Sequence, residues 1–186
     1  MGRLIYSLNV SLDGFIETTD HGLDWVSIDD ELHTWFNDQA RNLDAFLYGR
    51  RMYEVMAAYW PTAESDPSAT KPMLDFARIW LPKPKVVFSN TIQHVAWNGR
   101  LVSGPVREQL ATLRQDFDGD MDVSGPTLAA AFMDQGLIDE YQLVVHPVVL
   151  GAGTPFFSGV TARSSLRLLD AVTFESGVIC LRYAAT

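Results

Sequence analysis

The sequence predicts a single α/β domain over residues 1–186, with a mostly parallel central sheet and an antiparallel hairpin at its C-terminal end. The first observation behind this prediction is that short apolar runs typical of strands alternate with amphipathic, helix-like stretches through most of the chain. The second is that residues 166–184 form two strand-like runs around Ser176-Gly177, which is the pattern of a hairpin. The sequence shows no internal repeat and no linker, so we expect one domain.

The strands are predicted from period-two alternation or from short buried runs. In residues 3–11, the polar residues Ser7, Asn9 and Ser11 alternate with apolar ones, so this strand has two different faces. Further strands are expected at residues 44–49, 86–90, 121–125 and 141–151, followed by the two arms of the hairpin.

The helices are predicted from apolar residues at helical spacing. They are expected at residues 29–42, 50–60, 73–81, 105–117 and 126–136. Asp29 or Asp30 is expected to cap the first helix, and Gly136 to close the last. Residues 61–70 are polar and contain proline, so we expect a loop there and the best candidate for a mobile segment.

Charge and composition limit the classes of partner. The chain has 14 Lys and Arg against 23 Asp and Glu, a net charge of −9, and it has no basic stripe for nucleic acid or an anionic membrane surface. Its single cysteine, Cys180, lies in an apolar run and is expected to be buried and inert. The N-terminus has no signal-peptide pattern, and no apolar run approaches the ~20 residues that span a bilayer. We therefore expect a cytoplasmic protein.

Candidate site residues follow from the expected topology, because such sheets bind ligands beyond the carboxyl ends of their strands. At one strand end, Gly49, Arg50 and Arg51 open a helix. Free N–H groups and two guanidiniums there would suit a phosphate. The alternative, a strand-end glycine followed by two solvated arginines, is equally compatible with the sequence.

A second strand end carries Ser89, Asn90 and Thr91, three small hydrogen-bonding side chains. Such a group suits a ribose or a 2′-phosphate. Polar loop residues after a strand are common, so this stretch also fits an ordinary loop.

A third strand end carries Ser124, Gly125, Pro126, Thr127 and Leu128. Glycine would bring the main chain against a pyrophosphate, and proline fits the first helical turn. The alternative is that the serine simply caps the helix without any ligand. Spacing alone slightly favours the cap, since the stretch has neither a Gly-x-Gly-x-x-Gly pattern nor a Walker loop.

The end of the first strand supplies the substrate-side candidates. Asn9 and Asp13 lie there, with Trp25, Asp30 and Glu31 a little downstream. A carboxylate beside a polar strand end could hold or protonate a heterocycle. Equally, the aspartate of "LDG" could be a turn residue, and the two acidic residues at the helix start could cap it.

The sequence lacks the motifs of metal-binding sites and of hydrolases. The four histidines are scattered without ligand spacing, so no metal site is expected. Residues 116–122, "DFDGDMD", resemble a calcium loop, but the glycine is misplaced and position twelve is a threonine. We expect a solvated acidic turn. No Gly-x-Ser-x-Gly elbow of a hydrolase is present.

Five stretches together resemble the dihydrofolate reductase-like superfamily, and most closely its branch of bacterial riboflavin-biosynthesis reductase domains, the RibD C-terminal domain, with its stand-alone relatives. They are, in family order, "SLNVSLDGFI", "DAFLYGRRMYEVM", "PKVVFSNT", "VSGPTLAAAFMDQGLIDEYQLVVHPVVLGAGTPFF" and the closing hairpin. The resemblance covers nearly the whole chain. It implies a three-layer α/β/α fold, NADPH as cofactor and a homodimer.

The resemblance also implies roles for the strand-end residues. Residues 49–51 match the motif whose arginines face cofactor phosphate, and residues 89–91 match the segment at the adenosine side. Residues 124–128 match the pyrophosphate loop, with serine in place of the first glycine. Val123 stands where riboflavin-pathway enzymes carry a glutamate.

On the substrate side, Asp13 matches the family's "LDG" aspartate, and Asp30 or Glu31 lies near the acidic residue of the first helix in folate enzymes. We therefore expect hydride transfer from NADPH to a small pteridine- or pyrimidine-like heterocycle bound near Asn9, Asp13 and Trp25. One of the three acidic residues, or an ordered water, would deliver the proton. Such an enzyme would be related to 5-amino-6-(5-phosphoribosylamino)uracil reductase and to dihydrofolate reductase.

A second hypothesis assigns the chain to another class of protein. The chain could be a non-catalytic homodimer, or one that binds flavin or deazaflavin, since a fold can be kept without its usual turnover. Replacing Arg50 and Arg51 separates the two hypotheses, because only the reductase needs them for cofactor phosphate.

Overall fold

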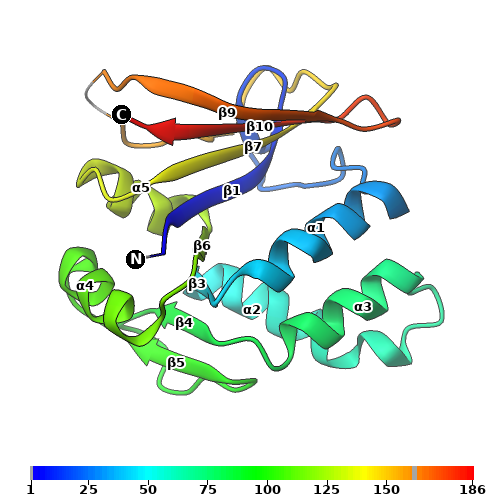
Figure 1. The fold of residues 1–186 in the computed structure, drawn as a ribbon. Helices are drawn as coiled ribbons and strands as arrows, with labels where there is room; N and C mark the ends of the chain where they lie inside the picture. Colours follow the sequence, from blue (N-terminus) through cyan, green and yellow to red (C-terminus); the bar gives the residue numbers. More distant parts are fainter. Residues whose placement is uncertain (1, 161–162) are drawn as a thin grey trace.

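An eight-stranded sheet forms the centre of the computed structural model, which describes residues 2–160 and 163–186 (Figure 1). In spatial order its strands are β5 (Gly99–Val102), β4 (Lys85–Phe88), β3 (Ala45–Gly49), β6 (Met121–Ser124), β1 (Leu4–Ser11), β7 (Glu140–His146), β10 (Ile179–Ala185) and β9 (Leu166–Thr173). The strands from β5 to β7 pair in parallel, and β10 is antiparallel to both of its neighbours. The mostly parallel sheet with a C-terminal antiparallel hairpin is thereby confirmed.

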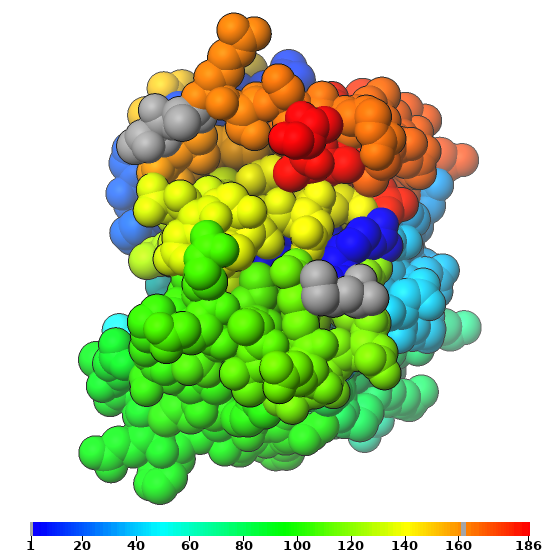
Figure 2. Space-filling view, turned by 60° about the vertical axis from the view of Figure 1, so that its left-hand side comes forward, coloured from blue at the N-terminus to red at the C-terminus, as the bar shows by residue number. Residues whose placement is uncertain are grey.

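Helices cover both faces of this sheet, which makes the predicted three layers (Figure 1). One face carries α1 (Asp30–Asn42), α2 (Arg50–Tyr59) and α3 (Lys71–Trp80), with a 3-10 helix, η1 (Trp60–Ser65), between the last two. The other carries α4 (Val106–Asp116) and α5 (Pro126–Asp134). Figure 2 looks onto this second face, where the green and yellow segments lie in front and the orange and red hairpin lies above them.

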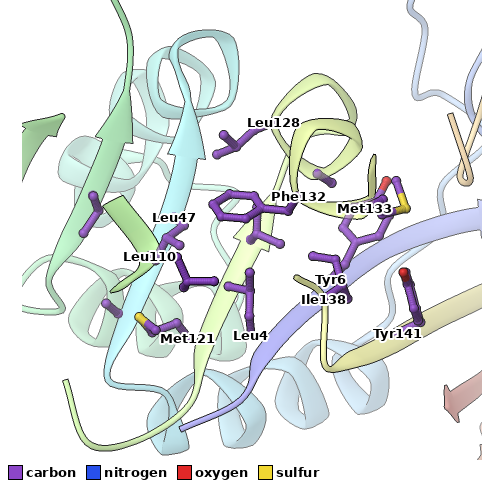
Figure 3. Packing of buried hydrophobic residues seen from close by; sticks show 14 of the residues in the cluster. Leu4, Tyr6, Leu47, Leu110, Met121, Leu128, Phe132, Met133, Ile138 and Tyr141 are labelled. Atoms are coloured by element: carbon purple, nitrogen blue, oxygen red, sulfur yellow. The ribbon is translucent and has the colours of Figure 1, made fainter. Parts of the chain in front are cut away.

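The larger core lies between the sheet and the pair α4 and α5. Leu110 of α4 and Phe132 of α5 are buried against Leu4, Leu47 and other strand residues (Figure 3). Fully burying such side chains contributes about 1.5–3 kcal/mol each. A second cluster lies on the opposite face, between the strands and helices α1 to α3.

Strand alternation decides which side chains reach each face. On β6, Met121 and Val123 belong to the core under α4 and α5. Their neighbours Asp122 and Ser124 therefore point to the face of α1 and α2, since successive side chains of a strand alternate. This places two polar groups of β6 under the helices that carry the candidate site.

Local turn chemistry explains several boundaries. Asp29, not Asp30, caps α1, since its carboxylate accepts a 2.8 Å hydrogen bond from the Leu32 N–H. Gly125 precedes α5 with φ of +107°, a conformation that L side chains rarely adopt. Gly177 turns the hairpin with φ of +84°.

The structure corrects three expectations about elements. The strand predicted for residues 141–151 ends at His146, because Pro147 has no N–H for the ladder. Residues 61–65, the first half of the loop expected at residues 61–70, belong to the 3-10 helix η1. The edge strand β5 was not predicted, since four residues on an edge show little periodicity and depend on pairing with β4.

Two short strands form a second sheet that the sequence did not indicate. β2 (Phe15–Glu17) pairs with β8 (Thr154–Pro155).

The single cysteine, Cys180, is fully buried, and burial raises the pKa of its thiol to about 12, as expected for an inert cysteine. Among the described residues, no helix has the length and apolar character needed to cross a membrane.

Candidate active site

A cavity of about 600 Å³ lies between the sheet and helices α1 to α3. Its lining combines a polar group of strand residues, which we call the floor, with mainly apolar and aromatic side chains from the helices, the loop before α1 and strands β1 and β3, which we call the walls. The floor residues are Ser7, Asn9, Asp122, Ser124 and Gln142, and the walls include Ile28, His33, Phe36, Phe46, Tyr48, Met52, Met56, Trp60 and Phe76. An apolar pocket with a few convergent polar groups is the usual form of a small-molecule site.

Hydrogen bonds orient the floor amides. Gln142 Nε2 donates to Ser7 Oγ at 3.0 Å, which leaves the Gln142 amide oxygen available as an acceptor. Asn9 Oδ1 accepts from His146 Nε2 at 2.9 Å, so the Asn9 amide nitrogen is available as a donor. Burial lowers the pKa of His146, and a neutral ring with its proton on Nε2 fits this contact. The floor therefore presents a fixed pattern of donors and acceptors.

Asp122 is the buried carboxyl group of this floor. It lies on β6 between Ile5 of β1 and Phe46 of β3, and it is 8% exposed. Burial raises its pKa to about 7, an effect that a 2.5 Å hydrogen bond from Ser124 Oγ partly offsets. A carboxyl group with this pKa can hold a proton at neutral pH and release it during a reaction.

No site role was predicted for Asp122, which lies where the acidic turn expected over residues 116–122 overlaps the strand expected over residues 121–125. The turn ends before it: Asp116 and Asp118 precede β6, and Asp122 is part of the strand. The available signal was the alternation of Met121 and Val123 with Asp122, which marks a strand with one polar face.

The strand ends that the sequence singled out for a cofactor are brought together. β4, β3 and β6 are neighbours in the sheet, so residues 89–91, 49–51 and 124–128 follow one another along its carboxyl edge. A Cβ on Gly49 would lie 3.7 Å from Leu128 Cβ, and one on Gly125 would lie 3.6 Å from Met52 Cβ. The N-termini of α2 and α5 therefore lie close together. We call these three segments the strand-end cradle.

The helix starts in the cradle are not capped by side chains of the described residues. In particular, the Ser124 hydroxyl donates to Asp122 and not to α5, so the alternative of a serine cap is wrong. N–H groups in the first turn of each helix are left for another partner. Such groups and the helix dipole favour an anion.

The charged and polar side chains of the cradle are mostly exposed. Arg50 approaches Glu54 at 3.7 Å and Arg51 approaches Glu17 at 3.4 Å, and both arginine side chains are more than half exposed. Ser89 Oγ accepts from the Thr91 N–H at 3.1 Å, which forms a compact turn with Asn90 exposed at its tip. Both arginines can therefore reorient toward a ligand at little cost.

The predicted substrate-side acids lie elsewhere. Asp13 is exposed and accepts from Ser11 Oγ at 2.7 Å and from the N–H groups of Leu150 and Gly151 at 3.1 and 2.7 Å. These bonds, led by that from Ser11, lower the pKa of Asp13 and tie the loop after β7 to the loop after β1. The aspartate is not among the residues that line the cavity.

Asp30 and Glu31 begin α1 at the surface and are also absent from the cavity lining. Glu31 accepts from the Glu175 N–H at 3.1 Å, which joins the helix to the hairpin. Trp25 packs edge-on against His146, with ring centroids 5.5 Å apart. Its Nε1 is buried with no hydrogen-bond partner among the described residues. Of the five substrate-side candidates, only Asn9 lines the cavity.

A mostly parallel sheet between two layers of helices, with an antiparallel C-terminal hairpin, defines the class of the dihydrofolate reductase-like folds. The profile of the RibD C-terminal domain family matches residues 3–180, and the chain belongs to this family.

Individual proteins agree with this assignment. The uncharacterised protein YyaP of Bacillus subtilis is 34% identical over 182 residues, covering 97% of this chain and 94% of that protein. A putative riboflavin biosynthesis protein from Shewanella has a similar structure, with a TM-score of 0.78, 21% identity and 99% of both chains covered. Dihydrofolate reductase from Enterococcus faecalis, complexed with NADP(H) and RAB-propyl, gives a TM-score of 0.62 at 12% identity over 100% of this chain and 97% of that one. The fold is thus shared with reductases.

Proposed function

We propose that this protein is an NADPH-dependent reductase that transfers a hydride to a planar, pteridine- or pyrimidine-like heterocycle. The observation that carries the proposal is the adjacency of two sites. The strand-end cradle and the cavity meet at Ser124, which begins one and lines the other. A dinucleotide held by the cradle would therefore have its reactive end beside the cavity.

The cradle fits the phosphates of NADPH in its donor set. The uncapped N-termini of α2 and α5 offer backbone N–H groups, and Gly125 with its positive φ keeps the loop before α5 free of a side chain. Arg50 and Arg51 would bind phosphate oxygens by charge-assisted hydrogen bonds. Thr127 and the turn at residues 89–91 would add hydroxyl and amide groups. NADPH, when bound, supplies the hydride.

The cavity would bind the heterocycle, and the carboxyl group of Asp122 would hold the proton for the reaction. The aromatic walls would pack against the faces of a flat ring, while Asn9 and Gln142 bind its polar edge. Asp122 is protonated for part of the time at neutral pH, and it would deliver its proton to the nitrogen or oxygen of the reduced C=N or C=O bond.

The proton donor we propose thus differs from the one predicted from the sequence. A role for Asp13, Asp30 or Glu31 stays a prediction, but the carboxylates of Asp13 and Glu31 are already bound to backbone N–H groups. We infer that Asp13 positions the loop at residues 150–151 beside the site. Trp25 would help to fix His146, and through it Asn9.

We also propose that the protein is a homodimer. β9 is an edge strand with apolar side chains exposed along it, such as Leu168 and Leu169, and Ile179 is exposed beside it on β10. An exposed apolar edge of this kind favours pairing with a second copy. Sedimentation equilibrium tests the proposal, and a monomer at tens of micromolar protein would contradict it.

Titration with NADPH and NADH, followed by cofactor fluorescence, tests the cofactor assignment. We expect saturable binding of NADPH in the micromolar range. The double variant Arg50→Ala/Arg51→Ala should weaken it about 100-fold, since a hydrogen bond to a charged group contributes about 1.5–3 kcal/mol. The control Arg100→Ala removes an exposed arginine on β5 that pairs with Asp116, and should leave binding unchanged.

Two results would contradict the reductase. One is that neither nicotinamide binds below the millimolar range. The other is that the double variant binds NADPH as well as the wild type does. A flavin or deazaflavin that co-purifies or binds instead, identified by its absorbance spectrum, would support the alternative class.

A further inference from the structure

The charged side chains at one end of the cavity neutralise one another. This charged cluster consists of Arg3, Asp120, Glu140 and Arg182, and three of its members line the cavity. Glu140 is 1% exposed and accepts from both arginines, from Arg3 Nη1 at 2.7 Å and from Arg182 Nε at 2.8 Å. Asp120 pairs with Arg3 from the other side at 2.5 Å. Each guanidinium therefore already faces a carboxylate.

The remaining titratable groups of the cavity add no positive charge. Burial lowers the pKa of His33, which keeps the ring neutral at pH 7, and burial raises the pKa of Tyr48. Asp122 is neutral or negative. Arg50 and Arg51 lie at the strand-end cradle and belong to the proposed cofactor site. The described cavity wall is thus neutral or slightly negative.

The cationic side chains near the α1 and α3 side of the cavity are also bound to other groups of the protein. Arg41 pairs with Asp38 at 2.6 Å and with Asp75 at 2.5 Å. Lys83 Nζ donates to the carbonyl oxygens of Arg41 and Leu43. Burial lowers the pKa of Lys83, and its ammonium group is already bound to these two carbonyl oxygens.

A phosphate group would be poorly placed in these surroundings. It carries up to two negative charges, and its burial is costly without a cation to pair with it. Beside Asp120, Glu140 and Asp122 it would also meet like charge, which disfavours its binding. The polar floor and aromatic walls, in contrast, suit an uncharged ring.

We propose that the cavity takes an unphosphorylated heterocycle, and that Glu140 sets this preference by neutralising Arg3 and Arg182 from beneath. The inference deepens the proposed reductase function and rests on it. It separates this chain from 5-amino-6-(5-phosphoribosylamino)uracil reductase, whose substrate carries a phosphoribosyl group. Glu140 acts as a specificity determinant without itself lining the cavity.

A matched pair of probes tests the preference. They are 5-amino-6-(5-phosphoribosylamino)uracil and the same compound after its phosphate has been removed by a phosphatase. Their dissociation constants for the full chain are measured by calorimetry at neutral pH without cofactor. We expect the dephosphorylated probe to bind about tenfold more tightly or better, since like-charge contact is costly.

Equal or tighter binding of the phosphorylated probe would overturn the proposal, and so would a failure of both probes to bind. Neither result touches the cofactor assignment, which the separate NADPH titration decides. The two proposals can therefore fail independently.

The variant Glu140→Gln tests the residue. It removes one buried negative charge and should shift the ratio of the two affinities about tenfold toward the phosphorylated probe. Because a buried residue can be needed for folding, Asp120→Asn is the second variant, and it should shift the ratio in the same direction. The control Asp116→Asn breaks an exposed pair with Arg100 away from the cavity and should leave the ratio unchanged. An unchanged ratio in a folded Glu140→Gln protein, or in Asp120→Asn, would contradict the role of the charged cluster.

Discussion

The hydroxyl of Ser124 donates a 2.5 Å hydrogen bond to the buried carboxyl group of Asp122. This contact joins the two halves of the candidate active site, since Ser124 begins the strand-end cradle and Asp122 forms part of the cavity floor. Both side chains point to the same face because they are two residues apart on β6. A ligand that contacts Ser124 in the cradle therefore lies close to the carboxyl group of Asp122, which can hold a proton.

Replacing Asp122 by Asn should reduce turnover about 100-fold or more, because general acid catalysis contributes about 10²–10⁴-fold. Binding of NADPH should change little, since Asp122 does not belong to the cradle. The measurement is NADPH oxidation with the dephosphorylated heterocycle as substrate, alongside the fluorescence titration. Asp116→Asn is the control, as it removes an exposed carboxylate of the same segment of chain. Wild-type turnover in Asp122→Asn would exclude the proposed proton transfer.

Asp122 should also make folding stability depend on pH. Its pKa is 3.8 in the unfolded chain and about 7 in the folded protein, so the folded state binds more protons between these values. The favourable contribution is complete below pH ~4 and is lost as the pH rises through ~7. Between about pH 5 and about pH 8 the loss is about 3 kcal/mol.

Urea unfolding of the wild type and of Asp122→Asn at both pH values tests this effect, because the other titrating groups are common to the two proteins. The free energy of unfolding should fall more steeply in the wild type, and Asp122→Asn should be the relatively more stable protein at the higher pH. Parallel pH profiles would show that Asp122 is not perturbed in the folded protein.

Gly125 should tolerate substitution less well than Gly49, although both precede a cradle helix. Gly125 has φ of +107°, whereas Gly49 has φ of −74°, and an added Cβ would find open space or ordinary contact at both. Gly125→Ala should therefore cost about 1–3 kcal/mol through backbone strain. Gly49→Ala should cost much less. Thermal unfolding measures both, and an equal cost would argue against the left-handed backbone before α5.

Phe132 should be a main contributor to the stability of the larger core. Its side chain is fully buried between α5 and the strands (Figure 3). Its ring lies edge-on to that of Phe88, with the ring centroids 5.6 Å apart. Phe132→Ala should lower the free energy of unfolding by about 3–5 kcal/mol. Phe157 is 41% exposed and serves as the control, so Phe157→Ala should cost far less. Similar losses for the two variants in chemical denaturation would contradict the described packing.

Much of the fold could be predicted from the sequence because its long elements have clear periodicity. The alternation in residues 3–11 and the helical spacing in residues 29–42 both correspond to observed elements, β1 and α1. β5 was missed because its four residues have little pattern of their own and pair only with β4 at the edge of the sheet.

The cradle was predictable because parallel strands end at one edge, so residues far apart in sequence meet there. The cavity was harder, since it depends on how α1 packs over the sheet. Asp122 lies where an expected acidic turn overlaps an expected strand, and only the packing of α1 and α2 over β6 shows that it is buried. Asp13 was predicted as a site residue, but its carboxylate binds the N–H groups of Leu150 and Gly151. The sequence could not show this contact, because it depends on a loop 137 residues away.

A crystal structure of the protein grown with NADPH tests the central claim most directly. We expect the pyrophosphate between the N-termini of α2 and α5, with Arg50 and Arg51 on phosphate oxygens and the nicotinamide at the cavity beside Ser124. Cofactor bound elsewhere on the protein, or a nicotinamide pointing away from Asp122, would contradict it.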